Sequence, residues 1–353
     1  MSNKIFALIA IIILCGCYVA NAGNPDRKGE AGAYELLMNP WAKSSGLYSL
    51  NTARIQGMEA MRVNPAGLAF TRKTEINFSH SIWASGTDMG INALGVAQRV
   101  GETNTIGLNI MALDFGEVDR TTYRNPEGGL GTFNPSFFNI GVSYARAFSN
   151  SIYAGATVRV ISESIENVSS TGVAIDAGLQ YVTGERDQAR FGLSLRNVGT
   201  TMKFTGDGLS FRGNEPGGDY QQTLNQRSEP FELPSMLNIG ASYDFYLDAQ
   251  VDTPNHRLTT LANFTSNSFG RDEYGAGIEY GFKEYLSIRF AFRGETGMYD
   301  PETLKTSIYA GPSAGVTFQI PFEEDGPAIA VDYAYQHTQP FSGTHTFGLR
   351  FNL

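Results

Sequence analysis

Fourteen short runs of this 353-residue sequence alternate apolar residues with small or polar ones, and this pattern constrains the fold more than any other feature. In one run, for example, Val173 and Ile175 lie on one face while Ala174 and Asp176 lie on the other. A period of two is typical of β-strands with one apolar face. The sequence therefore predicts an all-β protein with strands near 74–84, 88–100, 104–115, 136–149, 151–163, 172–184, 188–198, 235–248, 256–267, 272–283, 285–295, 304–320, 327–338 and 344–353.

Charged residues in these runs fall almost entirely on the second face. They are Arg159, Asp176, Arg196, Asp244, Glu279, Arg289, Arg293, Asp332 and Arg350, and Arg146 near a strand end is the exception on the apolar face. A basic charge facing lipid at the bilayer midplane costs about 2–4 kcal/mol. The pattern thus predicts a membrane-spanning antiparallel β-barrel with an apolar outer wall and a polar lumen, in which near-balanced charges pair across strands or line a transport path. A soluble sandwich with solvated outer faces is the alternative.

The connections between the runs alternate in length. Long connections at 116–135 and 199–234 follow odd-numbered runs, and short ones at 149–150, 184–187 and 283–284 follow even-numbered runs. An even strand number, with short turns inside and long loops outside, is the rule for single-chain bacterial barrels. We therefore assign the long connections to the cell exterior. The C-terminal run ends with Gly348, Phe351 and Leu353, a pattern similar to the signal that the barrel-assembly machinery recognises.

The first residues have the features of a secretory signal peptide. Lys4 precedes the apolar stretch 5–14, and Ala20-Asn21-Ala22 is a small-residue cleavage site, so we expect residues 1–22 to be removed. The alternative is a lipoprotein with Cys17 as the acceptor. Both cysteines lie in this segment, which leaves the mature chain without disulfides or thiol chemistry. Loss of Lys4 changes the formal charge from -9 to -10, and this acidic balance argues against nucleic-acid binding.

Residues 23–72 do not alternate, and they precede the predicted barrel at 73–353. Fourteen strands enclose a lumen wider than their inward side chains can fill. We therefore expect residues 23–72 to fold back as a luminal hatch, with Asn64, Pro65, Ala66, Gly67 and Leu68 turning the chain toward the wall. The simpler interpretation is that Asn-Pro-Ala-Gly is only a turn.

The Asn64–Leu68 stretch resembles the hatch motif of the FadL superfamily of fourteen-stranded barrels. The segments 35–46, 139–148 and 347–353 are similar to the PorV/PorQ branch of that superfamily. The resemblance implies an outer-membrane protein of the type IX secretion system, which binds secreted cargo or the translocon. Segments 39–43 and 57–62 depart from the pattern of the cargo shuttle, so membership of the branch is better supported than the shuttle role.

Candidate chemistry is sparse. The histidines His80, His256, His337 and His345 are scattered, no metal or cofactor motif is present, and Ser342 with His345 is the one pair that suggests catalysis. The sequence thus predicts a protein that is not an enzyme and uses no cofactor. In the long connections, Tyr123, Phe133, Phe211, Tyr220 and Phe231 are candidates for contacting a protein partner, or they fold down and cap the barrel.

Two functions follow from these features. The first is cargo or translocon binding through the exterior loops, with the assembly machinery and outer-membrane lipid as further partners. The second is FadL-like transport of hydrophobic small molecules, which requires an apolar luminal pocket. The inward positions are mainly Gly, Asn, Ser and charged residues, which favours the first function.

Overall fold

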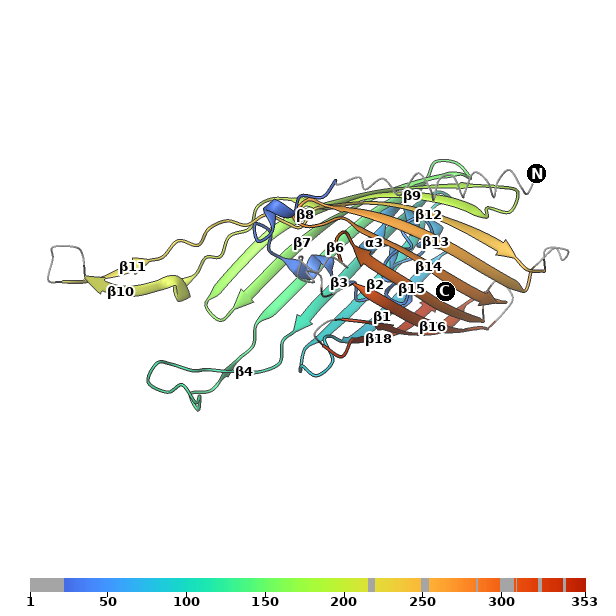
Figure 1. The fold of residues 1–353 in the computed structure, drawn as a ribbon. Helices are drawn as coiled ribbons and strands as arrows, with labels where there is room; N and C mark the ends of the chain where they lie inside the picture. Colours follow the sequence, from blue (N-terminus) through green and yellow to red (C-terminus); the bar gives the residue numbers. More distant parts are fainter. Residues whose placement is uncertain are drawn as a thin grey trace.

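The computed structural model is a closed barrel of fourteen antiparallel strands, and the strands are strongly tilted relative to the barrel axis (Figure 1). It describes residues 22–214, 220–248, 254–283, 285–298, 308, 310–322, 326–338 and 341–353. Nearly all of the predicted signal peptide, with both cysteines, lies outside these residues. The barrel strands are β1 Thr74–Ile82, β2 Gly90–Val100, β3 Asn104–Asp114, β6 Ser136–Ala147, β7 Ile152–Ile165, β8 Val168–Thr183, β9 Ala189–Gly199, β12 Met236–Tyr246, β13 His256–Asn267, β14 Glu273–Phe282, β15 Leu286–Glu295, β16 Gly311–Pro321, β17 Ala328–Gln336 and β18 Thr344–Asn352.

The fourteen predicted strands are confirmed, each paired with its neighbours in sequence, and β1 closes the barrel against β18. One connection differs from the prediction. The sequence places a gap at 164–171, but β7 and β8 continue through it and pair from Ile165↔Val168 onward, which leaves only Glu166 and Asn167 to turn. Ser169, Ser170 and Thr171 in this stretch are all polar, so the sequence shows no alternation that would indicate the strand extension. The start of the run predicted at 304–320 lies outside the described residues, and β16 begins at Gly311.

The two faces of the strands are distributed as predicted. Ile175 and Leu179 are 52% and 43% exposed on the outer wall, whereas Asp176 and Arg159 are each 1% exposed. The closed ring excludes the sandwich alternative, because a sandwich consists of two separate sheets packed face to face, whereas these strands form one continuous sheet. No helix among the described residues is long and apolar enough to cross a membrane.

Both long connections leave the same end of the barrel and carry hairpins that project away from it (Figure 1). Between β3 and β6 lie β4 Val118–Asp119 and β5 Thr132–Phe133. Between β9 and β12 lie η4 Asp207–Leu209, β10 Ser210–Asn214 and β11 Gln221–Asn225. By the loop-length rule this end faces the exterior.

The segment before β1, which we call the hatch (residues 23–72), enters the lumen from the exterior end. Its elements are η1 Pro25–Arg27, η2 Tyr34–Leu37, α2 Ala42–Ser45, α3 Ala60–Val63 and η3 Pro65–Phe70. Trp41, Met58, Met61 and Leu68 are at most 1% exposed and form its apolar centre. Hydrogen bonds fix the hatch to the wall, since Ser194 Oγ donates to Val63 O at 2.8 Å and Asn64 Nδ2 to Leu179 O at 3.1 Å.

Candidate ligand-binding site

The Asn64–Leu68 motif lies where the hatch turns toward β7 and β8. Asn64 caps η3, accepting from the Ala66 N–H at 3.2 Å while its amide donates to Thr52 O at 2.9 Å. Gly67 is needed for a close approach, because a Cβ there would overlap the Ile55 carbonyl. Leu68 is fully buried in the apolar centre of the hatch. The motif thus acts as a turn and as a wall contact together.

The barrel wall that faces the Asn64–Leu68 motif has a glycine, Gly178, at a position where any side chain would push the motif away. A Cβ at Gly178 would overlap Asn64 Oδ1 and stand 3.0 Å from Pro65 Cδ. We expect Gly178→Val to displace this part of the hatch and to increase the entry of a large hydrophilic antibiotic into cells that produce the barrel. Gly294→Ala on β15 is the matched control, since its Cβ would meet Tyr274 only at 3.4 Å. Unchanged antibiotic entry in the Gly178 variant would show that the motif does not seal the lumen.

Charged side chains inside the barrel form pairs between neighbouring strands and with the hatch. Arg289 lies opposite Glu279, with a nitrogen–oxygen distance of 2.5 Å. The corresponding distances in other pairs are 2.8 Å for Arg159–Asp176, 2.9 Å for Arg257–Glu279 and 2.5 Å for Arg54–Asp244. Arg54 joins the hatch to β12. Arg62 of the hatch donates to the carbonyl oxygens of Met38 and Glu35. The charges therefore hold the wall and hatch together.

Above the hatch, at the exterior end, the barrel encloses a cavity of about 430 Å³, which we call the mouth cavity. Its lining is mainly apolar and comes from the hatch, from strand ends and from the β9–β12 connection. The lining residues are Ala31, Gly32, Ala33, Tyr34, Glu35, Met38, Trp83, Leu113, Phe115, Phe137, Glu163, Phe204 and Phe231. The volume lies within the range of about 300–1,000 Å³ typical of small-molecule sites.

Aromatic pairs and backbone bridges build the walls of the mouth cavity. Phe115 and Phe137 meet edge to face with ring centroids 4.8 Å apart, at the ends of β3 and β6. The ring centroids of Phe231 and Phe204 are 5.7 Å apart. Position 32 must be glycine for the Phe231 ring to fit, since a Cβ at Gly32 would overlap that ring. The Gly32 N–H donates to Glu232 O at 2.9 Å. The hatch and the β9–β12 connection are therefore joined across the mouth.

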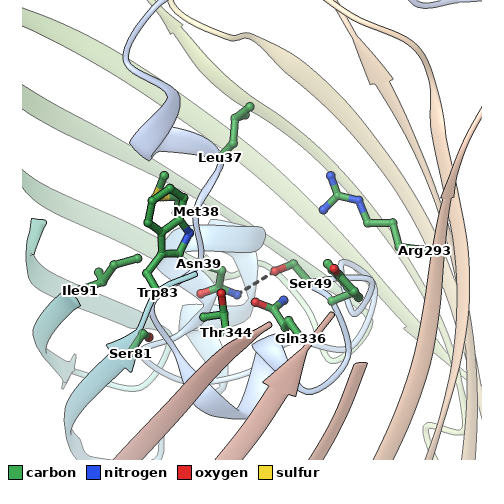
Figure 2. A pocket seen from close by; sticks show the side chains of 11 residues that line it. Leu37, Met38, Asn39, Ser49, Ser81, Trp83, Ile91, Arg293, Gln336 and Thr344 are labelled. Carbon is green, nitrogen blue, oxygen red and sulfur yellow. Dashed lines mark hydrogen bonds between the residues drawn. The ribbon is translucent and has the colours of Figure 1, made fainter. Parts of the chain in front are cut away.

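A much smaller cavity, of about 20 Å³, lies beside the hatch at the same end of the barrel (Figure 2). Met38 and Trp83 line both cavities. The smaller cavity has a polar lining that includes Asn39, whose amide donates to Ser49 Oγ at 2.8 Å. It has room for about one water molecule, so a larger ligand does not fit there.

The predicted partner-binding aromatics lie in three different environments. Tyr123, Phe211 and Tyr220 are 103%, 53% and 59% exposed on the projecting connections, where a protein could reach them. Phe133 is half-buried in the β4–β5 hairpin, opposite Val118. Phe231 folds into the mouth and lines the cavity. The capping alternative thus describes Phe231, while partner binding by the exposed residues stays a prediction.

The other predicted site residues lie in the wall. Gly348 pairs with Ser79 and Asp332, Phe351 pairs with Ile76, and Leu353 exchanges backbone hydrogen bonds with Thr74. These positions fit the closing strand, and their recognition by assembly machinery stays a prediction. Among the described residues, no three His, Cys, Asp or Glu side chains gather as a metal site.

No protein-family model and no curated protein matches the sequence. Solved structures do match. A mutant of the TodX monoaromatic hydrocarbon channel aligns at TM-score 0.57 and 11% identity, over 89% of this chain and 99% of that one. The Pseudomonas putida toluene transporter TodX aligns at 0.50 and 10%, over 92% and 97%, and a Pseudomonas aeruginosa FadL homologue at 0.50 and 10%, over 88% and 96%. The chain therefore has the FadL-like barrel fold.

Sequence reasoning missed the mouth cavity. The inward positions of mid-strand are polar, as expected, but the apolar lining comes from Trp83, Phe115 and Phe204, which follow strand ends, and from hatch residues far away in sequence. Aromatic residues at the ends of β3 and β6 were the available signal. The sequence placed Phe115 and Phe137 inside strands, and alternation alone does not say which connections fold back over the lumen.

Proposed function

We propose that this chain is an outer-membrane barrel that binds an apolar small molecule in its mouth cavity, as the first step of passage across the membrane. The observation that carries the proposal is the mouth cavity itself, an apolar space of about 430 Å³ at the exterior end of a FadL-like barrel. Water in such a space gains few hydrogen bonds, so an apolar molecule displaces it favourably.

The fold comparison supports this proposal over one based on exterior loops alone. The matching structures include a hydrocarbon channel and a toluene transporter, and their likeness extends over most of both chains. Buried hatch side chains such as Trp41, Met58 and Met61 fill the lumen, which makes binding and passage two separate steps. Binding needs only the mouth cavity, while passage needs the hatch to move.

A charge placed in the mouth cavity tests the binding step. Phe115→Lys should weaken binding of 4-phenylbutanol by about tenfold or more, because an ammonium group in an apolar cavity keeps its water and excludes the ligand. Isothermal titration calorimetry on the barrel in phosphatidylcholine nanodiscs measures the effect. Phe211→Lys, on the exposed β10–β11 hairpin, is the control and should bind as the unmodified protein does. Equal affinities in both variants would place the ligand elsewhere.

The exposed aromatics of the two connections favour a second candidate function. In this case the chain is a PorV/PorQ-like member of a type IX secretion system, and Tyr123, Phe211 and Tyr220 contact cargo signal domains or the translocon. Large exposed aromatic side chains on projecting hairpins are typical of protein interfaces. The sequence resemblance of segments 35–46 and 139–148 supports the same candidate.

Affinity purification from gently solubilised native outer membranes separates the two candidates. Recovery of secreted proteins with type IX signal domains, lost when Tyr123, Phe211 and Tyr220 are changed to Ser, would support the secretion role. A barrel that is recovered without protein partners but with a bound apolar molecule supports the small-molecule role.

A further inference from the structure

Two carboxyl groups interrupt the apolar lining of the mouth cavity. Glu35 belongs to η2 of the hatch and Glu163 to the end of β7, and their side chains are 2% and 4% exposed. Both side chains line the same cavity, and their carboxyl groups interact electrostatically. Within the described residues, no N–H or O–H group donates to either carboxylate oxygen of Glu35. A buried acid without a donor costs free energy, so the pair is suited to a partner that brings donors.

Little positive charge lies beside the pair. Arg62 is the cation that acts on Glu35, but its Nε and Nη2 donate to backbone carbonyl oxygens of Met38 and Glu35. Arg159, on the same face of β7 as Glu163, forms its ion pair with Asp176. The two guanidinium groups thus direct hydrogen bonds to other acceptors. Burial raises the pKa of the Glu35 carboxyl, as expected of an acid with too little compensation.

We propose that the mouth cavity selects apolar molecules that carry a basic nitrogen, with the ammonium group held by Glu35 and Glu163. An ammonium has three N–H donors and one positive charge, which match two facing carboxyl groups. The hydrocarbon part of the ligand lies against the aromatic side chains of the cavity. A ligand with a carboxylate at the same end meets like charge and is disfavoured. This inference rests on the proposed function and names its ligand class.

Three probes with one hydrocarbon part test the selection: 4-phenylbutylamine, 4-phenylbutanol and 4-phenylbutanoate. Each is titrated calorimetrically into the full mature barrel in phosphatidylcholine nanodiscs. The amine should bind at least about tenfold more tightly than the alcohol, because charge-assisted hydrogen bonds are the stronger kind, and the carboxylate should bind most weakly. This comparison needs no variant and so does not depend on how a substitution affects folding.

Glu35→Gln and Glu163→Gln, made separately, assign the selection to the pair. Each should reduce amine affinity toward that of the alcohol, so that the ratio of the two affinities falls toward one while the alcohol still binds. Glu127→Gln, at an exposed site between β4 and β5, is the matched control and should keep the full preference. Repeating the titration in nanodiscs with phosphatidylethanolamine separates two sources of the amine. Weaker binding of 4-phenylbutylamine in these nanodiscs would identify the natural amine as a membrane lipid. Unchanged binding would identify it as a free molecule.

Equal affinity for the three probes would overturn the inference and leave the proposed function standing. An amine preference that survives in both glutamine variants would also overturn it. If none of the three probes binds, the proposed function itself fails. The comparison of the three probes therefore distinguishes failure of the proposed ligand class from failure of the proposed binding site.

Discussion

Oxidation of a barrel carrying Thr52→Cys and Gly240→Cys should stop uptake of an apolar molecule without affecting its binding. Thr52 lies in the hatch and Gly240 in β12, and a Cβ at Gly240 would stand 3.1 Å from Thr52 Cβ. Disulfides need a Cβ–Cβ separation of about 3.5–4.5 Å, so a small local shift allows the bond to form. Because buried hatch side chains fill the lumen, we expect a hatch fixed to the wall to block the passage of a ligand.

The measurement is uptake of radiolabelled toluene by cells that produce the double variant, before and after addition of dithiothreitol. Uptake should fall to the level of cells without the barrel when the bond is formed, and reduction should restore it. The two single-cysteine variants are the controls. Undiminished uptake by the oxidised protein would show that the hatch does not lie on the route.

Asp176→Asn should cause the largest loss of stability among single substitutions in the lumen. Asp176 accepts from Arg159 Nη2 at 2.8 Å and from the Asn197 N–H at 2.6 Å, and both members of the ion pair are buried. Arg62 and Arg196 add positive charge nearby. Removal of one partner from a buried ion pair typically costs about 3–5 kcal/mol, since the remaining charge is left without compensation.

Urea unfolding of the refolded barrel in lipid vesicles measures this change in the free energy of unfolding. Asp207→Asn, at an exposed site before β10, is the control and should change it by less than about 0.5 kcal/mol. Replacing both members with Arg159→Met and Asp176→Leu should recover most of the loss, because no unpaired charge is then buried. A single variant as stable as the control would mean that water or other groups already compensate Arg159.

The barrel could be predicted from the sequence because lipid imposes a simple rule on every strand. A position such as Ile175 meets the bilayer and the next, Asp176, meets the lumen, so the alternation reports the fold directly. The rule fails beyond the bilayer, where both faces of a strand meet polar surroundings. That is why the extension of β7 and β8 around Glu166 was read as a loop.

The candidate site could not be predicted in the same way, because its residues come together only through the path of the hatch. Glu35 and Glu163 are 128 positions apart, and nothing in their local sequence pairs them. For Phe231 the sequence left partner contact and capping of the barrel both open, and only its packing on Gly32 places it in the mouth cavity. Hatch contacts of this kind follow from tertiary packing and leave no periodic pattern.

Photoaffinity labelling tests the central claim, that the mouth cavity is the ligand site, most directly. A diazirine-bearing alkylbenzene is bound to the mature barrel in nanodiscs, irradiated, and mapped by peptide mass spectrometry, with and without excess 4-phenylbutanol. We expect competed adducts on the peptides that contain Phe115, Phe137 and Phe231. Adducts confined to outer-wall residues such as Ile175 and Leu179, or adducts that the alcohol does not reduce, would contradict it.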